Sequence, residues 1–183
     1  MDATPRLTLR QAFAQPAALV MFFFGFSSGL PFLLVGSTLS TWLKESGVSL
    51  EHIGLLSLVG LTYSFKFLWS PAVDGLRLPL LAHLGQRRSW LLLAQGALAA
   101  ALLWMAWLTP SGSFAWFIAA AALAAFAGAT QDVVIDAYRI EIAPLEAQGA
   151  LAATATLGYR IALLLSGALA LILADHIAWS LIY

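Results

Sequence analysis

The chain has 183 residues, of which 61% are hydrophobic and 10% charged, and nine basic side chains balance nine acidic ones. This composition is typical of a membrane protein and not of a soluble one. A neutral chain gives no reason to expect a nucleic-acid partner, because phosphate binding needs a strongly basic surface. The absence of cysteine excludes disulfides, thiolate catalysis and thiolate metal sites.

Apolar runs predict a series of membrane-spanning helices, since a helix needs about 20 mostly apolar residues to cross a bilayer. Residues 1–16 form a short polar segment before the first run, and that run is too long for a cleaved signal peptide. The sequence therefore predicts an all-α membrane protein with a transmembrane bundle over residues 17–183. The expected spans are about 17–42, 53–73, 89–109, 114–138 and 148–174, and residues 177–183 begin a sixth.

The connections between the expected spans alternate in charge. One side carries six arginines and the other carries only Lys44. The six arginines are Arg6, Arg10, Arg77, Arg87, Arg88 and Arg139. Because basic residues gather in cytoplasmic loops, the first 16 residues and the N-terminus are expected in the cytoplasm.

Four ionisable residues fall inside expected spans, namely Lys66, Asp132, Asp136 and Arg160. Each central charge opposes insertion by about 2.5–3.5 kcal/mol unless it is paired or hydrated. Asp132, Asp136 and Arg139 share one helix face at spacings of four and seven. We expect Lys66, Asp132 and Arg160 to converge on one hydrated chamber, although the sequence does not decide which base pairs with which acid. The alternative is a set of structural salt bridges, most plainly for Asp136 with Arg139.

The stretch GFSSG at residues 25–29 matches the nucleophile motif of hydrolases. That motif needs a turn between a strand and a helix, and a histidine base, whereas this copy lies in an apolar run and no expected span holds a histidine. Gly25 and Gly29 instead indicate close helix packing, with a loosened helix around Pro31. The three histidines are too far apart for a metal site, so we expect neither an enzyme nor a bound cofactor.

Several longer strings resemble known transporters. WSPAVD at 69–74 and HLGQRR at 83–88 resemble the loop between the second and third helices of the major facilitator superfamily. GFSSGLPFLLVGSTLSTWL, IGLLSLVGLTYSFKFLWSP and QDVVIDAYRIE resemble the muropeptide permease (AmpG) family, which is grouped with acetyl-CoA transporters. The resemblance runs from about residue 22 to 183. It implies the N-terminal six-helix half of such a bundle, completed by a second half in the same chain or from a partner.

The resemblance also implies proton-driven import of cell-wall muropeptides across the bacterial inner membrane for peptidoglycan recycling. In this interpretation Asp132 and Asp136 couple protons to transport. The expected substrate-binding residues are Tyr63, Lys66, Gln131, Tyr159 and Arg160, and the expected cytoplasmic gate residues are Asp74, Arg87, Arg88 and Arg139. Two alternatives remain open: a transporter of another large anion such as acetyl-CoA, and a truncated membrane protein that does not transport.

Overall fold

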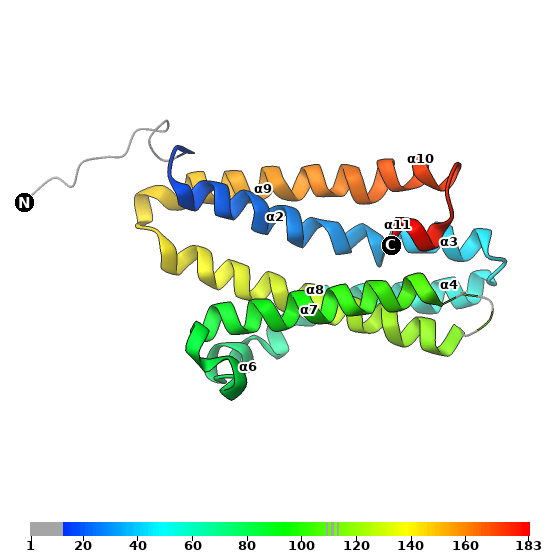
Figure 1. Ribbon diagram of the computed structural model, residues 1–183, viewed down its shortest axis with the longest axis horizontal. Coiled ribbons are helices and arrows are strands. Elements are labelled where there is room, and N and C mark those ends of the chain that lie inside the picture. The colour runs from blue at the N-terminus through cyan, green and yellow to red at the C-terminus, as the bar shows by residue number, and fades with distance from the viewer. Residues whose placement is uncertain (1–12, 109, 111, 113) are drawn as a thin grey trace, which may run out of the picture.

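The computed structural model describes residues 13–183, apart from 109, 111 and 113. Most of the expected cytoplasmic segment, including Arg6 and Arg10, lies outside these residues. The described part is a bundle of helices without strands, which confirms the predicted all-α class (Figure 1). Four helical stretches are long and apolar enough to cross a membrane: Pro16–Glu45, Gln86–Trp107, Phe114–Ile142 and Leu145–Ala174.

The first stretch consists of α2 (Pro16–Leu34) and α3 (Ser37–Glu45), separated by a turn at Val35 and Gly36. The irregular winding expected around Pro31 therefore occurs at Val35 and Gly36 instead. Pro31 stays inside α2, and its carbonyl oxygen still accepts a hydrogen bond from the Val35 N–H at 2.9 Å. A Cβ atom on Gly36 would lie 2.9 Å from the Phe32 carbonyl oxygen. The chain can turn this tightly because Gly36 has no side chain.

The second expected span, 53–73, differs from a single α-helix. It contains α4 (Leu50–Ser57), α5 (Leu61–Phe65) and α6 (Ser70–Gly75), joined by tighter 3₁₀ turns at Leu58–Gly60 and Lys66–Leu68. Gly54 and Gly60 weaken the α-helical winding here, because glycine is a poor helix former. Lys66 thus stands on a 3₁₀ turn, a winding that often marks a functional hinge.

The remaining helices form two close pairs. α7 packs along α8, and α2 packs along the chain that contains α9 and α10 (Figure 1). The bounds are α7 (Gln86–Trp107), α8 (Phe114–Ile142), α9 (Gln148–Leu164), α10 (Ala170–Ala174) and α11 (Trp179–Ile182). One turn of π-helix, Leu165–Leu169, joins α9 to α10.

Glycines bring α2 and α9 into backbone contact. A Cβ atom on Gly25 would overlap the backbone of Ala155, and one on Gly158 would overlap the backbone of Phe22. A Cβ atom on Gly29 would lie 2.6 Å from the Tyr159 carbonyl oxygen. The packing interpretation of Gly25 and Gly29 is therefore confirmed, and α2 and α9 have no room to slide past each other.

Gly25→Leu is expected to destabilise the bundle, because the new side chain must push α9 away from α2. Overpacking of this kind costs typically 1–3 kcal/mol, and about that much is expected here. Gly96→Leu is the matched control, since nothing lies within 4 Å of a Cβ atom at Gly96. Thermal unfolding in detergent should show a lower midpoint for Gly25→Leu only. Equal midpoints for the two variants would contradict the close contact.

The described residues form two separate hydrophobic cores that hold the bundle together. The first, which we call the α3 core, joins α3 to α7 and α8 through Leu39, Trp42, Met105 and Phe117. The second, the α2 core, joins the start of α2 to the end of α8 and to α9 through Ala18, Met21, Ile135 and Leu151. The turn at Val35 and Gly36 lies where the first span passes from one core to the other.

Candidate functional site

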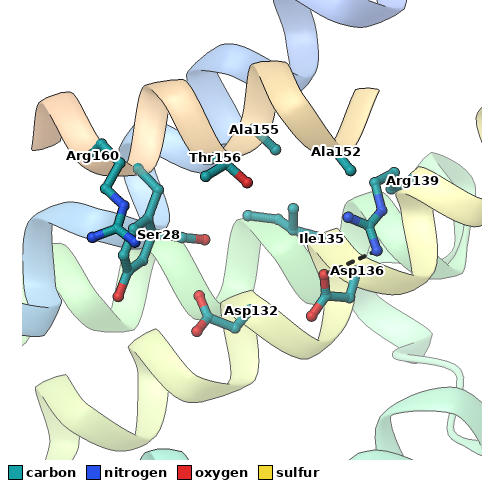
Figure 2. A pocket seen from close by; sticks show the side chains of 11 residues that line it. Ser28, Asp132, Ile135, Asp136, Arg139, Ala152, Ala155, Thr156 and Arg160 are labelled. Atoms are coloured by element: carbon teal, nitrogen blue, oxygen red, sulfur yellow. Dashed lines mark ion pairs between the residues drawn. The ribbon is translucent and has the colours of Figure 1, made fainter. Parts of the chain in front are cut away.

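A cavity of about 290 Å³ lies between α2, α8 and α9 (Figure 2). α2 contributes little side-chain volume to its wall, because Gly25 and Ser28 are small. The acidic groups come from α8, and α9 provides small side chains followed by an aromatic and a basic one. The lining residues are Gly25, Ser28, Asp132, Ile135, Asp136, Arg139, Ala152, Ala155, Thr156, Tyr159 and Arg160.

α8 presents Asp132, Asp136 and Arg139 to the cavity on one face, as their spacing predicts (Figure 2). Arg139 Nη2 lies 3.8 Å from Asp136 Oδ1, so the local pair expected from the sequence is formed. The Asp136 side chain keeps 61% of its surface exposed, whereas that of Asp132 keeps only 18%. Asp132 is therefore the more enclosed carboxylate of the two.

Lys66 reaches both aspartates from the 3₁₀ turn of the second span. Its Nζ atom lies 3.6 Å from Asp132 Oδ2 and 4.0 Å from Asp136 Oδ2. Asp132 Oδ1 is buried and has no hydrogen-bond partner within the described part of the chain. Because an enclosed charge is costly without a counter-charge, Lys66 supplies the counter-charge that a carboxylate at this position needs. The question of pairing is thus answered: Lys66 is shared between the two acids.

Arg160 lies on the opposite wall of the cavity, on α9 beside Tyr159 (Figure 2). Among the described residues no carboxylate lies within ion-pair distance of its guanidinium group. A guanidinium group in that position can bind a carboxylate or phosphate through two parallel hydrogen bonds. The structure thus places Asp132 and Arg160 on facing walls of one cavity, whereas Lys66, which pairs with Asp132, is not among the residues that line it.

Three residues expected to bind substrate are not among those that line this cavity, namely Tyr63, Lys66 and Gln131. Gln131 is fully buried, and its Nε2 donates a hydrogen bond to Ser27 Oγ at 3.0 Å. Successive residues on a helix point about 100° apart, so Gln131 faces α2 while Asp132 faces the cavity. The hydroxyl of Tyr63 is buried against Gly128. The Tyr63 ring packs edge-on against the Phe32 ring, with 5.5 Å between the ring centroids.

The expected gate residues divide into two groups. Arg87 forms an ion pair with Asp74 through Nη1. It forms a second with Glu141, whose Oε1 lies 2.9 Å from Arg87 Nε and 2.8 Å from Arg87 Nη2. Arg87 thereby ties α6, α7 and α8 together. Arg139 belongs to the cavity instead, and Arg88 is exposed beside a small separate cavity. Glu141 was missed by the sequence analysis, although it lies in the charged stretch of α8 on the arginine-rich side.

A second residue missed by the sequence analysis is Gln148, at the start of α9. Its Nε2 lies within hydrogen-bond distance of three carbonyl oxygens in and just beyond the last turn of α8, those of Arg139, Ile140 and Ala143, at 3.2, 3.4 and 2.8 Å. The last carbonyls of a helix have no partner within the helix. Gln148 supplies one and so fixes the end of the helix that carries the cavity acids.

Comparison with known proteins places these features in a family. A family model described as acetyl-coenzyme A transporter 1 matches residues 17–125. An anhydromuropeptide permease of Escherichia coli K12 is 43% identical over 172 residues, which cover 93% of this chain and 34% of that protein. A Rickettsia conorii protein named putative transporter AmpG 4 is 40% identical over 155 residues, covering 85% of this chain and 37% of the relative.

An uncharacterised protein of Haemophilus influenzae is 39% identical over 165 residues, or 90% of this chain and 38% of that protein. The chain thus spans about a third of the length of these relatives. The family match covers more than half of the chain, and the apolar helices and the relatives' names agree with it. The chain is a multi-pass membrane protein and belongs to the muropeptide permease (AmpG) family of the major facilitator superfamily.

Proposed function

We propose that the chain forms part of a proton-coupled transporter that imports anhydromuropeptides across the bacterial inner membrane for peptidoglycan recycling. The names of the Escherichia coli and Rickettsia relatives motivate this substrate. The observation that carries the proposal is the cavity in which Arg160 lies opposite Asp132, whose carboxylate pairs with Lys66. An anion site beside an enclosed carboxylate is what coupled uptake of an acidic solute requires. A second half, in the same protein or from a partner, closes the cavity.

In this proposal Arg160 binds a carboxylate of the peptide portion of the substrate. Tyr159 and Thr156, which line the same wall, donate hydrogen bonds to its sugar or amide groups. Lys66 acts first as the counter-charge of the two acids, because both lie within 4.0 Å of its Nζ atom. It binds substrate only when an acid is protonated. Gln131 and Tyr63 then support the wall from behind.

Proton coupling is assigned to Asp132, with Asp136 as its neighbour. When a proton neutralises Asp132, Lys66 loses one of its two counter-charges and becomes available to an anion. Substrate and proton therefore favour each other's binding, which is thermodynamic coupling between two sites. A bound pair of this kind also changes the balance between outward-open and inward-open states.

The orientation proposed is N-terminus in the cytoplasm, because Arg77, Arg87 and Arg139 lie toward one end of the bundle and Lys44 toward the other. The Asp74–Arg87–Glu141 network, with Arg88, then forms the cytoplasmic gate. The chain has no cysteine. Single cysteines at Arg77 and Lys44 can therefore be labelled selectively. An impermeant maleimide on intact cells should reach position 44 and not position 77, and the reverse pattern would exclude this orientation.

The function is tested with the full-length gene product in vesicles. Radiolabelled anhydromuropeptide should accumulate when an acid-outside gradient is imposed and should stop accumulating when a protonophore dissipates it. Absence of gradient-driven accumulation in vesicles that contain folded protein would rule out the proposal.

A second candidate, import of acetyl-CoA or another large anion, is supported by the description of the family model. The phosphates of acetyl-CoA are ligands that Arg160 could equally hold. Competition separates the candidates: unlabelled muropeptide, and not acetyl-CoA, should inhibit uptake of the labelled muropeptide. Strong inhibition by acetyl-CoA would favour the second candidate.

A further inference from the structure

Two interruptions in neighbouring helices lie at the same level of the bundle. The first is the turn at Val35 and Gly36 between α2 and α3, and the second is the π turn Leu165–Leu169 between α9 and α10. A Cβ atom on Gly167 would lie 2.8 Å from Leu33 Cδ1, so the last turn of α2 rests directly on the π turn. Single π turns inside α-helices occur frequently at functional sites.

One buried hydrogen bond connects these interruptions across the helices. Thr38 Oγ1 donates to the Ser166 carbonyl oxygen at 2.7 Å, and Thr38 and Ser166 are 0% and 3% exposed. A π turn disturbs the regular α-helical pattern of hydrogen bonds, and Thr38 provides a partner for a carbonyl oxygen within it. The bond depends on α3 being held beside the π turn. The Thr38–Ser166 hydrogen bond therefore links the α3 core to the helix that carries Arg160.

The packing on the two sides of this level is different. Toward the cavity, α2 and α9 are in backbone contact through Gly25, Gly29 and Gly158 and so behave as one rigid unit. On the other side, α3 belongs to the α3 core with α7 and α8. The cavity lies between this α2–α9 unit and α8, so a small rotation of the unit changes the distance between Arg160 and Asp132.

We propose that the Val35–Gly36 turn and the Leu165–Leu169 π turn form one paired hinge, closed by the Thr38–Ser166 hydrogen bond, about which the α2–α9 unit rocks against α8 to open and close the cavity. The inference rests on the proposed transport function for what the motion achieves. The hinge itself is independent of the substrate.

The test uses the full-length protein with spin labels on cysteines at Leu19 of α2 and Leu92 of α7, both exposed. Thr38→Val keeps the shape of the side chain and removes the donor. It should broaden and shift the distance distribution between the labels, and lower gradient-driven uptake about tenfold, because a buried carbonyl oxygen loses its partner. Thr38→Ser keeps the donor and should retain the original distribution.

Thr41→Val is the matched control, since Thr41 Oγ1 donates only to Ser37 within α3, at 3.2 Å. Should Thr38→Val fail to insert, Gly36→Ala tests the hinge at the turn between α2 and α3 and should also shift the distribution. Unchanged distances and uptake in the Thr38→Val variant, or in Gly36→Ala where it replaces that variant, overturn the hinge. If no variant, including the original protein, accumulates muropeptide while Thr38→Val still shifts the distances, the proposed function fails and the hinge stands.

Discussion

Asp132→Asn in the full-length protein is expected to abolish proton-driven accumulation of substrate while leaving the helices inserted. Asparagine matches aspartate in shape but carries neither the charge nor the exchangeable proton. Lys66 keeps Asp136 as a counter-charge at 4.0 Å, so the substitution leaves no unpaired lysine. The bundle should therefore fold, with coupling alone removed.

The measurement is uptake into vesicles under an imposed pH gradient, beside substrate exchange without a gradient. Asp132→Asn should lose gradient-driven uptake and keep substrate exchange, because exchange needs binding and movement but no net proton transfer. Asp175→Asn is the control, since Asp175 is exposed at the other end of the bundle, where α10 ends. Full accumulation by Asp132→Asn would remove Asp132 from the coupling mechanism. Asp136→Asn should have a smaller effect, because Asp136 is largely exposed.

Arg160→Gln is expected to weaken substrate binding with little change in folding. Within the described residues, Arg160 forms none of the ion pairs found, so its loss leaves no acid uncompensated. A hydrogen bond to a charged group contributes about 1.5–3 kcal/mol, which corresponds to an increase in KM of roughly 10- to 150-fold.

The KM of Arg160→Lys should lie between those of the original protein and Arg160→Gln, since lysine keeps the charge but not the forked pair of donors. Lys44→Gln provides a control at the opposite end of the bundle. A muropeptide analogue with amidated peptide carboxylates should bind equally to the original protein and to Arg160→Gln. A normal KM for the acidic substrate in Arg160→Gln would show that the anion binds elsewhere.

The helical repeat was sufficient to predict the cavity face of α8. Asp132, Asp136 and Arg139 share it because residues three and four apart lie on one side of a helix. The same rule excludes Gln131, which the family motif had included, since it is one residue out of phase. The winding of the second span could not be predicted, because an apolar run has the same composition in an α-helix and in a 3₁₀ turn.

Contacts between distant segments were harder to predict. Glu141 meets Arg87 across 54 positions of sequence, and no local pattern specifies that pairing. The Gln148 cap depends on the geometry of the turn between α8 and α9. Charge counting predicted that the arginines share one side of the membrane, but only the packing of the helices determines which residues touch.

The acidic groups and the small side chains of the cavity lie on different helices. α8 carries the acids Asp132 and Asp136, and it is hydrogen-bonded to Ser27 of α2 through Gln131 and to Gln148 of α9 at its end. α9 faces them with Ala152, Ala155 and Thr156, which set how much room remains. Substrate preference could therefore be redesigned, or could diverge in evolution, by exchanging small side chains on one helix while the energy-coupling groups on the other stay untouched.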